Sequence, residues 1–223
     1  MVKVVRSYPA PESLKRESRK VSGSYKCQDV IEQLINDFHG KCYICETKNL
    51  TDIQVEHLLP HKGGLYPERK FEWENLFLSC PHCNTVKNQR KYDDGILDCC
   101  KVDPEEYLSF ELNENDVEVV CYDSENVLAK RTAMLVEEVF ETKNTGNLTY
   151  QSECRLKRLQ NEMGVFYKKL LEYRSHPENR LTGRTLLGML DRASEFAGFK
   201  RSYVRKHQNE YPQLYRYILS EET

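Results

Sequence analysis

Two short cysteine pairs constrain this chain more than any other feature of its sequence. Cys42-Tyr-Ile-Cys45 and Cys80-Pro-His-Cys83 are both C-x2-C pairs, and 34 residues lie between them. Four thiolates grouped in this way suit a tetrahedral Zn²⁺ in a closed structural site. A plain zinc ribbon has roughly 15 to 20 residues between its pairs, so the longer spacing predicts a folded insert between two zinc knuckles. We expect the insert to carry the function.

The remaining cysteines and the N-terminus bear on the compartment. The chain has nine cysteines, an odd number, and its first residues are charged where an export signal would be apolar. Reduced thiols are therefore expected rather than disulfide bonds. No apolar run approaches the roughly 18 to 20 residues of a membrane span, so we expect a soluble, cytoplasmic (bacterial) protein without a membrane partner. The cysteines outside the pairs are interpreted as small buried hydrophobes. They are Cys27, Cys99, Cys100, Cys121 and Cys154.

Charge is distributed unevenly along the chain. The net charge of −2 indicates no particular partner. Residues 93–126, however, hold twelve acidic side chains and one Lys, whereas residues 151–207 hold thirteen Lys or Arg and six Asp or Glu. The C-terminal half therefore has the cations for a local basic surface.

Composition and apolar spacing divide the chain into three regions. Residues 1–25, with two Pro and an excess of cations, are interpreted as an N-terminal arm. Residues 26–110 form the region with the zinc knuckles. Residues 111–223 are interpreted as mainly helical and as a docking region for a partner. The expected fold class is α+β, mostly helical.

Several elements can be placed by periodicity. Apolar positions recur at three- and four-residue steps from Gln28 to Phe38, which predicts an amphipathic helix that Gly40 ends. A short polar helix is predicted to begin near Pro81. Residues 117–122 (VEVVCY) are the best candidate for a further strand. Helical spacing dominates from about Ala129 onward.

The insert carries polar residues in a distinctive order. Glu56 and His57 end an apolar segment, and Pro60 and a Gly-Gly turn follow them. Trp73-Glu-Asn75-Leu comes next, and an Asn and a Lys follow the second cysteine pair. This order and spacing resembles the zinc-bearing branch of the HNH endonucleases, which are His-Me finger nucleases. The resemblance implies a ββα-metal core, in which a β-hairpin packs on one helix. Here a four-cysteine zinc site would staple that core, and a C-terminal helical region would follow it.

His57 is the residue best suited to general base catalysis. Phosphodiester hydrolysis needs an activated water, a cation on the developing charge and stabilisation of the leaving oxygen. The unperturbed pKa of histidine, about 6.5, allows it to take a proton from water at neutral pH. Because adjacent strand residues point to opposite faces, Glu56 and His57 can serve one phosphate only if the strand ends or twists there. Pro60 and the glycine turn favour such a break.

The resemblance also implies roles for the other polar residues. Glu56 and Asn84 stand at the positions of metal ligands in the HNH pattern, and both offer oxygen, so Mg²⁺ or Mn²⁺ fits better than a second Zn²⁺. Asn75 stands where the pattern has an Asn that ties the hairpin loop and orients the base. Lys87 falls three residues after Asn84 on the same helix face, where it could touch the scissile or an adjacent phosphate.

Two further histidines and the single tryptophan have competing interpretations. His61, four residues past the base, is interpreted as a solvated loop residue in preference to a phosphate contact. His82 lies between two zinc ligands and is predicted to be exposed, since four thiolates leave zinc no need of it. Trp73 is predicted to pack in the core beneath the hairpin rather than to stack on a base.

A wider resemblance concerns regulation and partners. Residues 13–20, an Asp103-Pro-Glu turn, the stretch 132–147 (TAMLVEEVFETKNTGN) and the length are similar to the PtuB-type HNH nucleases of Septu and retron-linked anti-phage systems. That similarity implies a toxic defence effector that an ABC-type ATPase (PtuA-like) holds in a higher-order complex. It favours DNA as the substrate, with RNA such as tRNA as the alternative. The competing function is a non-catalytic zinc-knuckle module that binds nucleic acid or protein.

Overall fold

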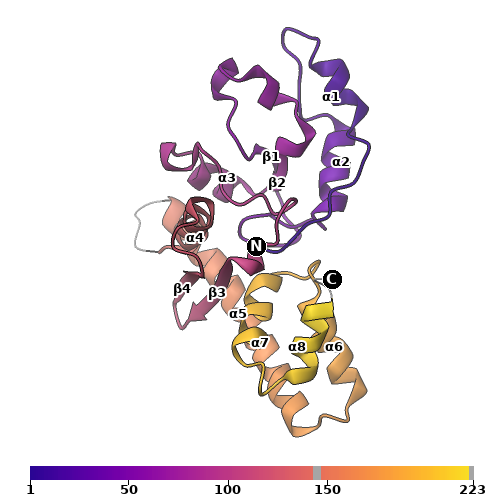
Figure 1. The fold of residues 1–223 in the computed structure, drawn as a ribbon, viewed down its shortest axis with the longest axis vertical. Coiled ribbons are helices and arrows are strands. Elements are labelled where there is room, and N and C mark those ends of the chain that lie inside the picture. Colours follow the sequence, from indigo (N-terminus) through magenta and orange to yellow (C-terminus); the bar gives the residue numbers. More distant parts are fainter. Residues whose placement is uncertain (143–146, 221–223) are drawn as a thin grey trace.

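The computed structural model describes residues 1–142 and 147–220. These residues contain two antiparallel hairpins with helices packed around them (Figure 1). In the first, β1 (Gln54–His57) pairs with β2 (Leu76–Ser79), so that Glu56 lies opposite Phe77 and His57 opposite Leu76. In the second, β3 (Leu108–Asn113) pairs with β4 (Asp116–Cys121). Each sheet has two strands. The strand predicted at residues 117–122 is therefore confirmed as the second strand of a hairpin.

Helices cover the first hairpin. α2 (Gln28–Asp37) packs on β2, and α3 (Pro81–Lys87) packs on β1. All four residues of β2 are buried, as their apolar run LFLS requires. α3 begins where it was predicted, because Pro81 fits the first helical turn and the Cys80 sulfur accepts the backbone N–H of Cys83. This hairpin and α3 confirm the ββα core.

The second hairpin lies between two other helices. α4 (Val127–Phe140) packs on β4, and α7 (Ala197–Lys206) packs on β3. The Asn126 side chain caps α4 by accepting the Ala129 N–H. α4 also contacts α3, so the second hairpin is packed against the first through this pair of helices.

The C-terminal half is helical, as its periodicity predicted. α5 (Asn147–Ser175) is the longest element, and α6 (Arg180–Leu190) packs on it. α8 (Pro212–Ser220) packs on α6 and α7 (Figure 1). The buried stripe along α5 has helical spacing. It consists of Leu156, Leu159, Met163, Phe166 and Leu170.

Two of the thirteen cations counted in residues 151–207 cannot contribute to a basic surface. Lys200 and Arg201 are buried instead of exposed. The Lys200 ammonium donates to Glu162, and the Arg201 guanidinium donates to Glu105 at 2.8 and 2.9 Å. These cations are turned inward because acidic partners distant in sequence neutralise them there.

The N-terminal segment is packed onto the core. Met1, Val2 and Val4 are buried, and α1 (Glu12–Glu17) contacts α2. The Arg6 guanidinium lies 4.6 Å from the centroid of the Trp73 ring, which is itself buried as predicted. Of the stretch 132–147, residues 143–146 lie outside the described residues.

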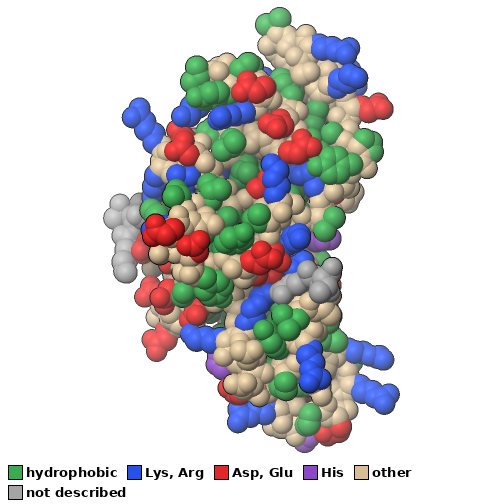
Figure 2. All heavy atoms as spheres, in the orientation of Figure 1, with side chains coloured by type: hydrophobic (Ala, Val, Ile, Leu, Met, Phe, Trp, Pro, Cys, Tyr) green, Lys and Arg blue, Asp and Glu red, His purple; other side chains and the backbone are tan. Residues whose placement is uncertain are grey.

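The surface carries mixed charge. Figure 2 shows acidic and basic side chains interspersed over this face, with Lys and Arg gathered at the α1 end and again at the opposite, α6 end. None of the described helices is both long and apolar enough to cross a bilayer.

Candidate active site and metal centre

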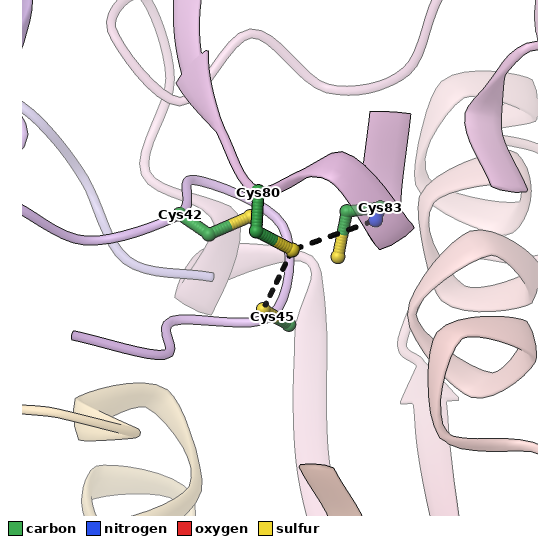
Figure 3. A group of neighbouring side chains, drawn as sticks. All are labelled: Cys42, Cys45, Cys80 and Cys83. Atoms are coloured by element: carbon green, nitrogen blue, oxygen red, sulfur yellow. Dashed lines mark hydrogen bonds between the residues drawn. The ribbon is translucent and has the colours of Figure 1, made fainter. Parts of the chain in front are cut away.

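The four paired cysteines form one buried cluster. Their sulfur atoms all lie within 4.8 Å of one another, and Figure 3 shows the side chains converging from two chain segments. Cys42 and Cys45 come from the loop after α2, Cys80 lies between β2 and α3, and Cys83 lies in the first turn of α3. Four converging thiols at this separation suit one tetrahedral Zn²⁺.

The first zinc knuckle, residues 41–48, is held by both halves of the molecule. Its own turn is closed by the Cys42 N–H, which donates to the Thr47 carbonyl at 3.0 Å. Arg158 of the helical half donates to the Lys48 carbonyl at 2.8 Å. The carbonyl of Ser194, also in the helical half, accepts from the Lys41 ammonium at 2.9 Å. The knuckle therefore lies at the junction between the hairpin core and the helices that follow.

Electrostatics favour the thiolate form at two of the four cysteines, whereas burial raises the pKa of Cys42 and Cys83 well above the usual range. Burial alone would raise the pKa of Cys45, but hydrogen bonds from the other cysteines and the charge of Arg155 lower it well below its usual range. Hydrogen bonding with Cys42 likewise lowers the pKa of Cys80. Metal binding requires deprotonated sulfur, so both shifts suit a cation site.

His82 is not exposed, contrary to the prediction. It is buried, and its ring nitrogens lie 3.0 Å from the Val139 carbonyl oxygen and 3.0 Å from Gln151 Oε1. Pro81 is the first residue of α3, and His82, which follows it, faces α4 and α5 rather than solvent. His82 therefore joins three helices, which is a packing role that its position between two zinc ligands did not indicate.

A cleft of about 640 Å³ lies beside the first hairpin. Among the residues that line it are the predicted Glu56, His57, Asn84 and Lys87, together with His61. The structure thus brings four of the five predicted catalytic residues to one surface. β1 ends at His57, which allows two adjacent residues to reach the same cleft.

His57 is buried and oriented by the backbone. Its Nε2 lies 3.1 Å from the carbonyl oxygen of Lys70. A carbonyl can only accept, so Nε2 carries the proton and Nδ1 keeps the basic lone pair. Burial lowers the pKa of His57 to about 4, so the imidazole is neutral at pH 7. Its ring makes edge contacts with Tyr25 and His61, at centroid distances of 4.5 and 4.8 Å.

Glu56 and Lys87 form a buried ion pair. Glu56 Oε1 accepts from the Lys87 ammonium at 2.6 Å, and Oε2 accepts from the Tyr43 hydroxyl at 2.6 Å. Burial raises the pKa of Glu56, although both of these contacts oppose the shift. Lys87 also donates to the carbonyls of His57 and Leu58, both at 3.0 Å.

The Lys87 ammonium makes its contacts within the protein, whereas the sequence predicted a contact with a phosphate group. An ammonium group has three protons, and Glu56, His57 and Leu58 accept all three. In this arrangement Lys87 ties α3 to the end of β1 and holds the Glu56 carboxylate.

Asn75 lies behind the cleft and fixes the loop after β1. Its Oδ1 accepts the Leu59 N–H at 2.8 Å, and its Nδ2 donates to the carbonyls of Leu59 at 2.9 Å and Arg69 at 3.0 Å. Arg69 precedes Lys70, whose carbonyl orients His57. Asn75 is thus connected to His57 through the backbone of residues 69–70.

The donor atoms around the cleft suit a divalent cation. Glu56 and Asn84, which carry carboxylate and amide oxygens, line the same space, and the two Glu56 oxygens also accept from Lys87 and Tyr43. His61 Nδ1 is buried and has no hydrogen-bond partner among the described residues. Oxygen donors are those that Mg²⁺ and Mn²⁺ prefer, and the orphaned imidazole nitrogen adds a candidate ligand.

Two tyrosines of the site were missed by the sequence analysis. Tyr43 lies within the first cysteine pair and donates to Glu56, and Tyr25 comes from the segment interpreted as an arm. No spacing rule connects either of them to Glu56 or His57. Only the fold shows these contacts.

Comparison with known proteins agrees with this geometry. Residues 42–90 match the family model described as HNH endonuclease. The match begins at the first zinc ligand and ends just after α3, so it contains every predicted catalytic residue. No curated protein matches the chain. The chain therefore carries an HNH endonuclease domain over these residues, with a four-cysteine cluster consistent with a zinc site.

Proposed function

We propose that this protein is a metal-dependent endonuclease that hydrolyses phosphodiester bonds of nucleic acid. One observation carries the proposal. A neutral, backbone-oriented His57 lies in the same cleft as Glu56 and Asn84, inside the residues that match the HNH family. A scaffold that only binds needs no buried base beside a carboxylate.

His57 acts as the general base. Its free Nδ1 takes a proton from the attacking water, while Nε2–H stays bonded to the Lys70 carbonyl. A base that is neutral at physiological pH is ready for this step without first losing a proton. Asn75 and the loop it fixes keep the ring in place.

Glu56 and Asn84 would hold a Mg²⁺ or Mn²⁺ ion. When bound, such an ion supplies the positive charge that stabilises the phosphorane and the leaving oxygen. Lys87 and Tyr43 orient the Glu56 carboxylate for that role. The zinc cluster is structural: it joins the loop before β1 to the start of α3, which carries Asn84.

Cleavage assays on the full chain test the proposal. The protein is incubated with plasmid, single-stranded DNA and bulk tRNA in Mg²⁺ or Mn²⁺, beside His57→Ala and the exposed control His176→Ala. We expect the wild type and the control to cleave, and His57→Ala to lose roughly 10²-fold or more while zinc content and fold stay unchanged.

Retained turnover in His57→Ala would overturn the assignment of the base. Absence of cleavage by the zinc-loaded wild type with every substrate would instead favour the non-catalytic zinc module. The substrate panel also tests the preference for DNA over RNA, since RNA is distinguished by its 2′-hydroxyl.

A narrower proposal concerns biological role. The similarity of residues 13–20 and 132–147 to PtuB-type nucleases supports a cytoplasmic anti-phage effector that an ABC-type ATPase restrains. Residues 1–25 and the helical half would dock on that partner. Co-expression with an ATPase encoded beside it, followed by size-exclusion chromatography, should give co-elution. Elution of the nuclease alone would contradict the partner without affecting the nuclease proposal.

A further inference from the structure

A segment outside the HNH match forms one wall of the catalytic cleft. Tyr25 lines the cleft, and its ring packs edge-on against His57 with a centroid distance of 4.5 Å. The residues before Tyr25 lead directly back to α1. The N-terminal segment is therefore part of the site.

Lys70 fixes this segment relative to the base. Its carbonyl oxygen lies 3.1 Å from His57 Nε2, and its ammonium donates to the Gly23 carbonyl at 2.9 Å. Gly23 sits so close to the Phe71 ring that an added Cβ would lie 3.2 Å from Phe71 Cζ. One residue thus holds His57 on one side and the N-terminal segment on the other.

A second hollow lies beside α1. A groove of about 810 Å³ runs between α1 and residues 71–74. Phe71 lines the groove, and Lys70, the preceding residue, contacts His57 in the cleft. The backbone of residues 70–71 thus links the groove to His57 of the cleft, although the two hollows share no lining residue. Cations and acids on the rim of the groove are Lys15, Arg16, Arg19, Glu12 and Glu74.

Three exposed cations lie along this path. Lys15, Arg19 and Lys26 form no ion pair with any residue that the structure describes. Glu17, by contrast, is shared by Lys20 at 2.6 Å and Arg16 at 3.5 Å. The Lys26 ammonium lies 5.4 Å from the centroid of the ring of Tyr25, which lines the cleft. Unpaired cations beside a hydrolytic cleft match the charge of a phosphate backbone.

We infer that residues 15–26 form the binding track for the substrate strand and contact phosphates on one side of the scissile bond through Lys15, Arg19 and Lys26. This inference rests on the proposed nuclease function. It assigns residues 15–26 to nucleic acid rather than to the ATPase partner, and it leaves the helical half as the docking region for that partner. The occupant is the nucleic acid that the cleft hydrolyses.

The test measures binding separately from cleavage. All proteins carry His57→Ala so that a labelled probe stays intact. Fluorescence anisotropy gives the affinity for a 20-base-pair DNA duplex, and for an RNA strand of equal length, at several salt concentrations. The track variant combines Lys15→Gln, Arg19→Gln and Lys26→Gln. The control combines Lys168→Gln, Arg180→Gln and Arg184→Gln, which remove equal charge from exposed positions of the helical half.

We expect the track variant to bind the preferred probe at least 10-fold more weakly than the parent. The slope of the logarithm of the binding constant against the logarithm of salt concentration should also fall in magnitude by about 2 to 3. Each phosphate contact contributes about 0.9 to this slope for duplex DNA and about 0.7 for single strands. The control should keep the parent's affinity and slope. Unchanged binding by the track variant, or an equal loss in the control, would overturn the inference.

The outcome is distinguishable from failure of the nuclease proposal. Cleavage by the wild-type chain is read in a separate assay. A wild type that cleaves, together with a track variant that binds normally, would contradict the track alone. Circular dichroism and zinc content of both triple variants should equal those of the parent, because all six side chains are exposed.

Discussion

Arg155 of α5 donates to the sulfur of Cys80 across 3.2 Å, so the helical half places a guanidinium directly against the zinc cluster. Four thiolates with one Zn²⁺ would carry a charge of −2, and Arg155 would offset part of it. Burial would lower the pKa of Arg155, but the charges of Cys45, Cys83 and Cys80 raise it. The cation is therefore bound to the cluster electrostatically.

Replacing Arg155 should weaken zinc binding. Arg155→Met removes the positive charge and the hydrogen bond to Cys80, so we expect zinc affinity to fall by about 10-fold or more, as for other residues that hydrogen-bond to metal ligands. Competition with a chromophoric chelator measures this. Lys157→Met, an exposed change on the same helix, is the control. Equal zinc affinity in both variants would show that the Arg155 contact has no part in metal binding.

Removing one zinc ligand should destabilise the whole chain. Cys45→Ser, like Cys80→Ser, should lose zinc and lower the free energy of unfolding by several kcal/mol, because structural zinc contributes about 10 to 16 kcal/mol in zinc-finger peptides. Metal analysis and denaturant unfolding provide the measurements. Cys154→Ser, at an exposed cysteine outside the cluster, should change neither. Folded wild-type protein that contains no zinc would contradict the site.

The buried ion pair predicts a non-additive mutant cycle. Lys87→Met leaves the Glu56 carboxylate buried without its cation, which should cost about 3 to 5 kcal/mol of stability. The double variant Glu56→Gln/Lys87→Met should recover part of that loss, since no charge then remains unpaired. Chemical unfolding of the four proteins gives the coupling free energy.

A phosphate role for Lys87 would give a different result. Lys87→Met would then weaken binding of nucleic acid at salt concentrations and temperatures where the variant is folded. The closed hydrogen bonding of the ammonium predicts instead that affinity for DNA stays within about twofold of wild type under those conditions.

Glu138 of α4 should stabilise the protein in a pH-dependent way. It accepts from the Tyr92 hydroxyl at 2.6 Å and Gln89 at 2.9 Å, and it pairs with Lys91 at 2.6 Å. Burial opposes ionisation, but these three contacts outweigh it and lower the pKa of Glu138. Its contribution is thus present above the ordinary carboxyl pKa of 4.5 and is lost as pH falls below that value.

The substitution Glu138→Gln tests that contribution. At pH 7 it should lower the free energy of unfolding by roughly 1 to 2 kcal/mol, since hydrogen bonds to a charged group are lost. The difference between wild type and variant should shrink as pH falls from about 5 toward 3. A difference that is constant over this range would contradict the assigned ionisation.

Local patterns in the sequence predicted the elements that local interactions form. The C-x2-C spacing placed the four sulfurs correctly, Pro81 marked the start of α3, and apolar periodicity located the helices of the C-terminal half. Each of these depends on neighbours within a few residues. The HNH pattern also placed Glu56, His57 and Asn84 on a common cleft.

What the sequence analysis missed depends on partners distant along the chain. Arg201 pairs with Glu105, 96 residues away, and His82 contacts Val139, 57 residues away. Periodicity shows that a helix has two faces but not which cations find an acid inside the core. Helix spacing relates Lys87 to Asn84, yet the acceptors of Lys87 lie at the end of β1 and in the residue that follows it, which helix spacing does not reveal.

The first zinc knuckle cannot be separated from the helical half of the chain without loss of hydrogen bonds. Arg158 and the Ser194 carbonyl, which belong to the helical half, complete the hydrogen bonding of Lys48 and Lys41. An excised fragment that spans only residues 42–90 would therefore expose backbone and apolar surface that the rest of the chain now covers. We therefore expect the stretch that matches the HNH family not to fold on its own, and point substitutions rather than truncations are the suitable test of its chemistry.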